Sequence, residues 1–295
     1  MDKVYWIAVD WGTTNFRAFL MEKDEVIDEV IGTEGILSVT ENQFDVVLHR
    51  NIEHWLTSKG HLPILLAGMV GSQKGWYEVP YQAVPITAKG LTESLKEITT
   101  YWGSKAWIVP GIQNLSQYAL PDVMRGEETQ LLGLVDSADT YAILPGTHSK
   151  HSVISHGEIK TFTSFMTGEL YSLLIKSSMI GKGLPKQIDN EKYFLMGLEK
   201  SKKNIPFTHL IFSARTKQLN KEIPAEYVGS YLSGILIGIE LNNVECENKI
   251  WVITNESLGE KYIVAGKYFG LNMEYVSGNE CFLKGAYKLI NQLGN

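Results

Sequence analysis

The sequence predicts an α/β protein built from two similar domains, each with the element order βββαβα. Apolar strand-like segments and segments of helical periodicity succeed one another along the 295 residues. This order occurs twice, beginning at Tyr5 and again at Tyr141. A Gly-Thr turn follows the first strand of each half, at Gly12-Thr13 and at Gly146-Thr147. We therefore expect two duplicated domains that hold a polyphosphate between them.

The expected elements have the following ranges. The first half should have strands at 5–9, 16–21, 26–31, 63–67 and 106–109, and helices at 42–56 and 92–102. The second should have strands at 141–144, 151–155, 159–165, 249–254 and 272–276, and helices at 167–179, 190–202, 225–243, 256–269 and 280–293. We expect a sugar-side domain at 1–120 and a nucleotide-side domain at 121–295, with the last helix placed to pack back on the first domain.

Composition and charge exclude several classes of protein. A hydrophobic content of 44% and a charged content of 20% are typical of a soluble globular chain. A net charge of −6 gives no electrostatic footprint for nucleic acid or for a membrane surface. Two cysteines suit a reducing compartment, and there is neither a signal peptide nor an apolar run of ~20 residues. We expect a cytoplasmic protein whose partner is a small molecule, not a nucleic acid or a membrane.

The first turn has the composition of a phosphate site. Glycine lets the backbone approach an anion, and the backbone N–H groups and threonine hydroxyls can donate to its oxygens. Asp10 could hold Mg²⁺, directly or through water. Arg17 could reach a phosphate or pair with a carboxylate. The nucleotide-binding candidates in this turn are Gly12, Thr13, Thr14, Asn15 and Arg17. Taken alone, the turn could also be that of an ordinary β-hairpin.

Two further segments are candidates for the other end of the nucleotide. By the duplication, the turn after the strand at 141–144 should hold phosphates, and its candidates are Gly146, Thr147, His148 and Lys150. With no second histidine, cysteine or carboxylate at ligand or dyad spacing, His148 is interpreted as a substrate or phosphate contact or as a plain hydrogen-bonding residue, and not as a catalytic base. The same interpretation applies to His151. The strand-to-helix turn with Asn255 and Ser257 is where an adenine or ribose would rest.

An acidic pair precedes the second turn. Glu127 and Glu128 should lie in the first turn of a helix, where the helix dipole keeps a carboxylate ionised and able to accept a proton. Such acids are also common as ordinary first-turn residues. Arg125 beside them could meet an anionic substrate.

At this point the chain resembles a known family. The segments DWGTTNFRAFL, AGMVGSQKGW, VMRGEETQLLG, LPGTHSK and FMTGELYSLL are similar to those of the 2-dehydro-3-deoxygalactonokinases, over about residues 4–290. The resemblance implies an actin-like ATPase (ribonuclease H-like) fold with the ligand cleft between the domains. It also implies phosphorylation of the terminal hydroxyl of 2-dehydro-3-deoxy-D-galactonate with ATP and Mg²⁺. Family members tend to have Gly-Thr-Ser where this chain has 255–257, and Asn255 can adopt the left-handed conformation of a glycine.

The resemblance gives each candidate an expected role. Glu127 is expected to accept the hydroxyl proton, with Glu128 as its rival, while Asp10 positions the metal. The substrate-side candidates are Gly71, Ser72, Lys74, Trp76, Arg125, Glu128, Thr167 and Glu169. Two other functions stay open: a phosphohydrolase of the same superfamily, and a sugar- or nucleotide-binding regulator without turnover. The sequence also leaves open which sugar epimer is the substrate. It leaves open whether the protein forms a homodimer, because the apolar segment 225–243 suits either a core or an interface.

Overall fold

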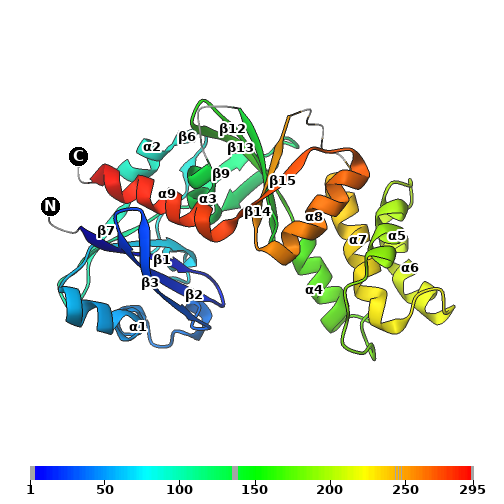
Figure 1. The fold of residues 1–295 in the computed structure, drawn as a ribbon, viewed down its shortest axis with the longest axis horizontal. Coiled ribbons are helices and arrows are strands. Elements are labelled where there is room, and N and C mark those ends of the chain that lie inside the picture. Colours follow the sequence, from blue (N-terminus) through cyan, green and yellow to red (C-terminus); the bar gives the residue numbers. More distant parts are fainter. Residues whose placement is uncertain (1–3, 135–138, 243, 245, 247, 294–295) are drawn as a thin grey trace. The chain divides into compact units, whose positions relative to one another are not determined.

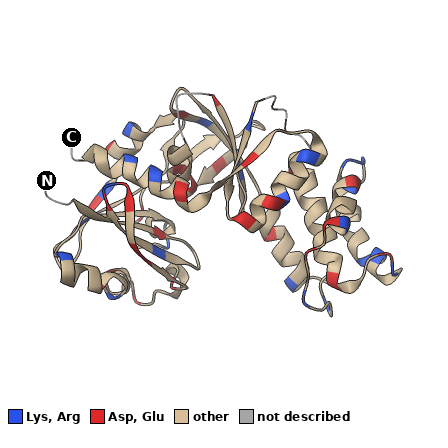
Figure 2. Cartoon of the chain, viewed as in Figure 1, with Lys and Arg blue, Asp and Glu red and all other residues tan. Residues whose placement is uncertain are grey.

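The computed structural model describes residues 4–134, 139–242, 244, 246 and 248–293, which form two compact units (Figure 1). The first unit comprises Met1–Asp139, Ser152–Phe162 and Gly278–Asn295, and the second comprises Thr140–His151 and Thr163–Ser277. None of the helices that the structure describes is long and apolar enough to cross a membrane. Lysine and arginine are interspersed with acidic residues on both units (Figure 2). The functional division between 1–120 and 121–295 stays a prediction.

The first unit is built on a six-stranded sheet of order β3-β2-β1-β4-β8-β7. Its strands are β1 (Tyr5–Trp11), β2 (Phe16–Glu22), β3 (Glu25–Gly32), β4 (Ile64–Gly68), β7 (Lys96–Thr99) and β8 (Lys105–Ile108). Strand β1 is antiparallel to β2 and parallel to β4, so both of its neighbours are paired and its apolar run is buried. Helix α1 (Phe44–Lys59) packs its buried residues, Phe44, Leu48, Ile52 and Trp55, into the same core.

Another six-stranded sheet repeats this topology. Its order is β15-β14-β11-β12-β13-β6, formed by β11 (Thr140–Leu144), β12 (Ser149–Ser155), β13 (Glu158–Phe165), β14 (Ile250–Thr254), β15 (Met273–Ser277) and β6 (Ile86–Thr87). Strands β3-β2-β1-β4-β8 and β13-β12-β11-β14-β15 therefore occur in equivalent order. In both sets the first strand of the half is parallel to the fourth, and the fourth to the fifth. The expected duplication is confirmed at the level of topology.

Short elements complete the first unit. A three-stranded sheet contains β5 (Gln82–Ala83), β9 (Ile112–Leu115) and β10 (Pro121–Met124). Helix α3 (Glu127–Leu134) packs along α9 (Gly278–Leu293), which also contacts α2 (Ala88–Glu93) (Figure 1). The α3–α9 crossing is close because it is made at glycines: a Cβ at Gly285 would lie 1.8 Å from the carbonyl oxygen of Thr129.

The described part of the second unit contains five α-helices, which lie together (Figure 1). They are α4 (Thr167–Ser177), α5 (Glu191–Ser201), α6 (Phe207–Leu219), α7 (Val228–Leu241) and α8 (Glu256–Phe269). Helix α7 is buried almost all round and contacts the other four, as its apolar sequence predicts. Three short 3₁₀ turns, Ile36–Ser38, Met69–Gly71 and Ala225–Tyr227, connect larger elements.

The structure differs from the expected elements in the segment 92–102, in helix α6 and in the short strands β5, β6, β9 and β10, which were not expected. The helix expected at 92–102 is wrong: α2 ends at Glu93, and Lys96–Thr99 form β7, paired antiparallel to β8. The β-branched pair Ile98-Thr99 suits an edge strand that buries only Ile98. Helix α6 was not expected, although Leu210, Ile211 and Ala214 give it a buried stripe. The remaining helices agree within a few residues, except that residue 243, the expected end of the helix at 225–243, lies outside the described residues.

Candidate active site

The first Gly-Thr turn lies between β1 and β2 in the first unit. Gly12 donates from its backbone N–H to the carbonyl oxygen of Asn15 over 2.9 Å, which closes the turn. The side chains of Thr13, Thr14 and Asn15 are exposed. The turn is supported from behind by Gly35, where a Cβ would lie 2.4 Å from the carbonyl oxygen of Thr13. The tip is therefore held at its backbone while its donor groups remain accessible.

Asp10 and Arg17 face each other across the two strands. They are directly opposite in the β1–β2 register, and the Arg17 guanidinium forms an ion pair with the Asp10 carboxylate. Arg17 also donates to the side-chain oxygen of Asn279 in α9. Of the two roles expected for Arg17, the structure shows the carboxylate pairing, and a phosphate contact stays a prediction. Asp10, Gly12, Asn15 and Arg17 line one hollow of about 510 Å³.

The surroundings of Asp10 can be compared with what a divalent metal needs. Among the described residues there is no group of three or more acidic, histidine or cysteine side chains that could hold a metal ion. Magnesium, however, keeps several waters and is held by one or two carboxylates together with substrate phosphates. A single carboxylate with 19% exposure beside an accessible turn fits that kind of site.

The acidic segment follows β10 and begins α3. Gly126 has a φ of +109°, a conformation that favours glycine, and a Cβ there would meet the Cα of Gly68 at 3.3 Å. Gly68 ends β4, and a Cβ on it would lie 3.2 Å from Oδ1 of Asp10. The glycines thus allow the start of α3 to lie close to the end of β4, near the carboxylate of Asp10.

The two glutamates of this segment have different environments. Glu127 is half-buried, and one of its oxygens accepts from the backbone N–H of Arg125 over 3.1 Å. Glu128 is fully buried, and accepts from the backbone N–H of Gly126 over 2.6 Å and from the Thr129 hydroxyl over 3.1 Å. Burial, and then the charge of Glu127, raise the pKa of Glu128 to about 8. Near neutral pH the buried carboxyl is therefore mainly protonated, while Glu127 is the one that solvent or a ligand can reach.

A pocket of about 540 Å³ with both apolar and polar lining lies in the first unit beside these groups. Its lining includes the first turn, the glycine-rich loop after β4 and the start of the acidic segment, through Thr13, Ser72, Gln73, Lys74, Tyr81 and Arg125. The guanidinium of Arg125 donates to the carbonyl oxygen of Val79 over 2.7 Å and lies over the Tyr81 ring at 4.4 Å. Gly71 makes room for it, because a Cβ there would lie 2.8 Å from its Nη1.

Arg125 is a buried cation without a counter-charge among the residues that the structure describes. It is 8% exposed, and in the described part of the chain no carboxylate forms an ion pair with it. Its Nε and Nη1 atoms and the Ser72 hydroxyl are buried without a hydrogen-bond partner among the described residues. Buried charges of this kind are normally paired, so the pocket wall is suited to an anionic ligand. Lys74 is exposed at the same pocket, whereas Trp76 packs against Phe44 in the core.

The second Gly-Thr turn lies in the second unit, after β11. Gly146, Thr147 and His148 are exposed, and the first turn of α4 packs directly on them. The carbonyl oxygen of Thr147 accepts from the backbone N–H of Glu169 over 2.9 Å, and the His148 ring bonds to the Glu169 carboxylate over 2.6 Å. Gly168 permits this contact, because a Cβ there would lie 2.2 Å from the carbonyl oxygen of Gly146.

Two candidates near this turn are directed elsewhere. Lys150 is 5% exposed and donates to the Ser164 hydroxyl of the adjacent strand. His151 is 5% exposed and bonds to Glu240 of α7 over 2.9 Å. Both side chains are held within the second unit, and a ligand contact for either stays a prediction.

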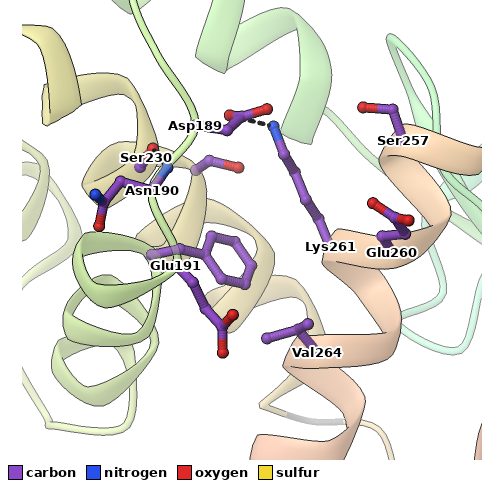
Figure 3. A pocket seen from close by; sticks show the side chains of 10 residues that line it. Asp189, Asn190, Glu191, Ser230, Ser257, Glu260, Lys261 and Val264 are labelled. Atoms are coloured by element: carbon purple, nitrogen blue, oxygen red, sulfur yellow. Dashed lines mark hydrogen bonds and ion pairs between the residues drawn. The ribbon is translucent and has the colours of Figure 1, made fainter.

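A pocket of about 200 Å³ lies among α5, α7 and α8 in the second unit (Figure 3). Lys261 of α8 extends toward Asp189 and forms an ion pair with it over 2.7 Å, and Ser257 and Glu260 lie on the same helix (Figure 3). Asn255 has a φ of −82° and caps α8 by accepting from the Leu258 N–H, so it does not use the left-handed conformation that an asparagine can adopt. The sequence did not indicate Asp189, Asn190, Ser230, Glu260 or Lys261, which come from the segment before α5, from α7 and from α8 and form no local motif.

The repeated strand order, with a Gly-Thr turn after the first strand of each half, defines the actin-like ATPase fold of sugar kinases. The same fold occurs in a structure from Porphyromonas gingivalis described as an N-acetylglucosamine kinase, with a TM-score of 0.52, 14% identity and 97% and 99% of the two chains covered. The chain belongs to the 2-keto-3-deoxy-galactonokinase family, which it matches over residues 10–289.

Named relatives agree with this assignment. The chain is 33% identical to the 2-dehydro-3-deoxygalactonokinase of Escherichia coli (strain K12) over 295 residues, which is 98% of this chain and 99% of that protein. A crystal structure from Sinorhizobium meliloti that carries the same enzyme name superposes with a TM-score of 0.89 at 28% identity, covering 98% and 99% of the two chains. The family match includes every candidate residue, from Asp10 to Ser257, and the chain is a carbohydrate kinase.

Proposed function

We propose that the protein transfers the γ-phosphoryl group of ATP to the C6 hydroxyl of 2-dehydro-3-deoxy-D-galactonate. The observation that carries the substrate assignment is the unpaired cation of Arg125. A sugar acid supplies the carboxylate that this cation lacks, whereas a neutral sugar would leave the charge buried and unpaired. Membership of the 2-keto-3-deoxy-galactonokinase family supports the same substrate class.

The substrate pocket suits such a ligand in its other groups. The Ser72 hydroxyl and the exposed Lys74 lie at the pocket with Arg125, so they can donate to the carboxylate or the neighbouring keto oxygen. The Tyr81 ring and the Val79 carbonyl hold the guanidinium in one orientation. A ligand would therefore meet a preorganised cation and would not have to order a flexible one.

We assign the general base to Glu127. Its carboxylate is accessible, lies in the first turn of α3, and is next to the residue that would hold the substrate anion. It would accept the C6 hydroxyl proton as that oxygen attacks the γ-phosphorus and ADP leaves. Glu128 is the weaker candidate because it has no exposed surface and is mainly protonated near neutral pH.

The phosphates of ATP would be held by the exposed donors of the two Gly-Thr turns, Thr13 and Thr14 in one and Gly146 and Thr147 in the other. Asp10 would hold Mg²⁺ through its accessible carboxylate, and that ion would neutralise phosphate charge. The pocket beside Ser257, Glu260 and Lys261 is the proposed place for the nucleoside, where hydroxyl and charged groups can meet a ribose.

The test is a coupled assay of ADP formation with Mg²⁺, ATP and 2-dehydro-3-deoxygalactonate. Wild-type protein, Glu127→Gln and Glu128→Gln form a matched set, because each change replaces one carboxyl by an amide of the same size. We expect sugar-dependent turnover that Glu127→Gln lowers by about 10² or more, and that Glu128→Gln lowers by less than about tenfold.

Each other result has a defined meaning. Loss of turnover in Glu128→Gln, without a loss in Glu127→Gln, would mean that Glu128 is the general base. ADP release that is indifferent to every sugar acid would instead indicate a phosphohydrolase. The gluconate epimer, run beside the galactonate epimer, measures selectivity at the hydroxyl in which the two differ.

A further inference from the structure

A buried carboxylate in the second unit lies behind the second Gly-Thr turn. Glu240 is the one charged side chain in α7, whose sequence is otherwise apolar or small, and it is 2% exposed. Taking a carboxylate out of water is costly unless it is fully hydrogen-bonded, and a well-packed apolar residue is often at least as stabilising. Stability of the helix bundle alone therefore does not account for a charge here.

The hydrogen bonds of Glu240 lead to the turn from several elements. Oε1 accepts from the hydroxyl of Ser149, the first residue after the turn, over 2.7 Å. Oε2 accepts from the hydroxyl of Thr167, the first residue of α4. The Tyr262 hydroxyl of α8 lies 3.0 and 2.9 Å from the two oxygens. One carboxylate thus joins the end of the turn to the start of the helix that packs on it.

The His151 ring and the Tyr141 hydroxyl extend the hydrogen bonds around Glu240. The His151 ring bonds through Nε2 to Glu240 over 2.9 Å and through Nδ1 to the Tyr141 hydroxyl over 3.0 Å. Because the carboxylate accepts throughout, Nε2 must carry a proton. Burial, and then the charge of Glu240, raise the pKa of Tyr262 well above its ordinary value, so its hydroxyl remains a donor.

Because α4 packs on the turn, the hydrogen bonds of Glu240 affect the shape of the turn. Gly146 and Thr147 contact the first turn of α4 through their backbone, so the start of α4 has to keep its place for the turn to keep its shape. The turn and the start of α4 contact each other directly. Glu240 joins the same two segments a second time, by accepting from the hydroxyls of Ser149 and Thr167. Displacement of either segment would move the exposed residues Gly146, Thr147 and His148.

We propose that Glu240 is a positioning residue that shapes the second Gly-Thr turn for nucleotide phosphates, with Ser149, Thr167 and Tyr262 as its working partners. The inference rests on the proposed function in one respect, namely that this turn binds the phosphates of ATP. Glu240 touches no substrate, and it acts by holding the segments that do. Groups that orient a binding site from behind commonly matter about as much as tenfold or more for its affinity.

The test compares two buried tyrosines of the second unit. Tyr262→Phe removes a hydroxyl that donates to Glu240, whereas Tyr231→Phe removes one that bonds to Ser213 over 2.9 Å, away from the turn. Both rings are at most 1% exposed, so the two variants lose the same atom from equally buried sites. The KM for ATP, the KM for the sugar acid and the melting temperature are measured for each, together with Glu240→Gln.

We expect Tyr262→Phe and Glu240→Gln to raise the KM for ATP by about tenfold, with the KM for the sugar acid unchanged. Tyr231→Phe should leave both constants unchanged at a similar loss of melting temperature. An unchanged KM for ATP in Tyr262→Phe, or an equal rise in both tyrosine variants, would overturn the proposal. Should Glu240→Gln not fold, the tyrosine pair still decides the question.

A failure of the proposed kinase function would look different. In that case the wild-type protein shows no sugar-dependent ADP formation, and the dissociation constant of a non-hydrolysable ATP analogue, measured by calorimetry, replaces the KM in the same comparison. Wild-type protein that binds no nucleotide at all would overturn both proposals.

Discussion

Replacement of Glu128 by Gln should change how the stability of the protein depends on pH. The Glu128 carboxyl is fully buried in the first unit, and its pKa is raised from 4.5 to about 8, first by burial and then by the charge of Glu127. Glutamine has the shape of the protonated acid. Its carbonyl can accept from Gly126 N–H and its amide can donate to the Thr129 hydroxyl, so the local hydrogen bonds survive.

The direction of the effect follows from proton linkage. Below pH 4.5 the carboxyl is protonated in both the folded and the unfolded chain, and it adds no pH dependence. Between 4.5 and about 8 the unfolded chain loses the proton while the folded chain keeps it, so the free energy of unfolding falls as pH rises. At about 1.4 kcal/mol per pH unit, the total loss across this window is roughly 5 kcal/mol, and by pH 7 it is roughly 3 kcal/mol.

The assay is urea unfolding of wild-type and Glu128→Gln protein at several pH values between 5 and 8.5. Tryptophan fluorescence reports on the unit that contains Glu128, because every tryptophan except Trp251 lies there. The variant should gain stability relative to wild type steadily from pH 5 to pH 8. Glu127→Gln removes the neighbouring charge, so its own pH dependence should be shallower than that of wild type.

A difference in stability between wild type and Glu128→Gln that stays constant across this pH range would contradict the raised pKa of Glu128. It would mean that Glu128 is ionised in the folded protein at neutral pH. The assignment of Glu127 as the more competent base would then lose one of its two supports, and the other, the accessibility of Glu127, would stand alone.

Two further substitutions test the substrate pocket and the first unit. Arg125→Met should raise the KM for the sugar acid by about 10- to 100-fold, since a hydrogen bond to a charged group contributes about 1.5–3 kcal/mol. Its melting temperature should fall little, because an unpaired buried charge is removed with it; a large fall without a change in KM would contradict the proposed role. Gly285→Ala should destabilise the protein by about 1–3 kcal/mol or more in thermal unfolding, because the new Cβ would lie 1.8 Å from the carbonyl oxygen of Thr129. Gly32→Ala is the control, since its nearest neighbour outside the chain-adjacent residues is 4.0 Å away, and equal losses would disprove the crowding argument.

The duplicated order of strands and the places of the two Gly-Thr turns could be predicted from the amino-acid sequence. Residues that are adjacent in the sequence determine these features. Apolar runs such as Tyr5–Val9 form buried strands, and a glycine followed by a hydroxyl residue indicates a turn. The start of α3 at Glu127 was also predictable, because first-turn acids and a preceding glycine are local signals. Local signals gave a wrong answer at 92–102, where pairing with β8 decided the conformation.

The surroundings of the side chains in those motifs depend on the three-dimensional packing and could not be predicted from the motifs. Glu127 and Glu128 are adjacent in the sequence and have the same side chain. Their burial differs because residues from other elements of the fold cover Glu128. Arg125 lacks a counter-charge, and Ser149, Thr167, Tyr262 and His151 converge on Glu240, from segments up to 91 residues away from it. Burial, charge pairing and pKa depend on all neighbours in space, whereas secondary structure depends largely on neighbours along the chain.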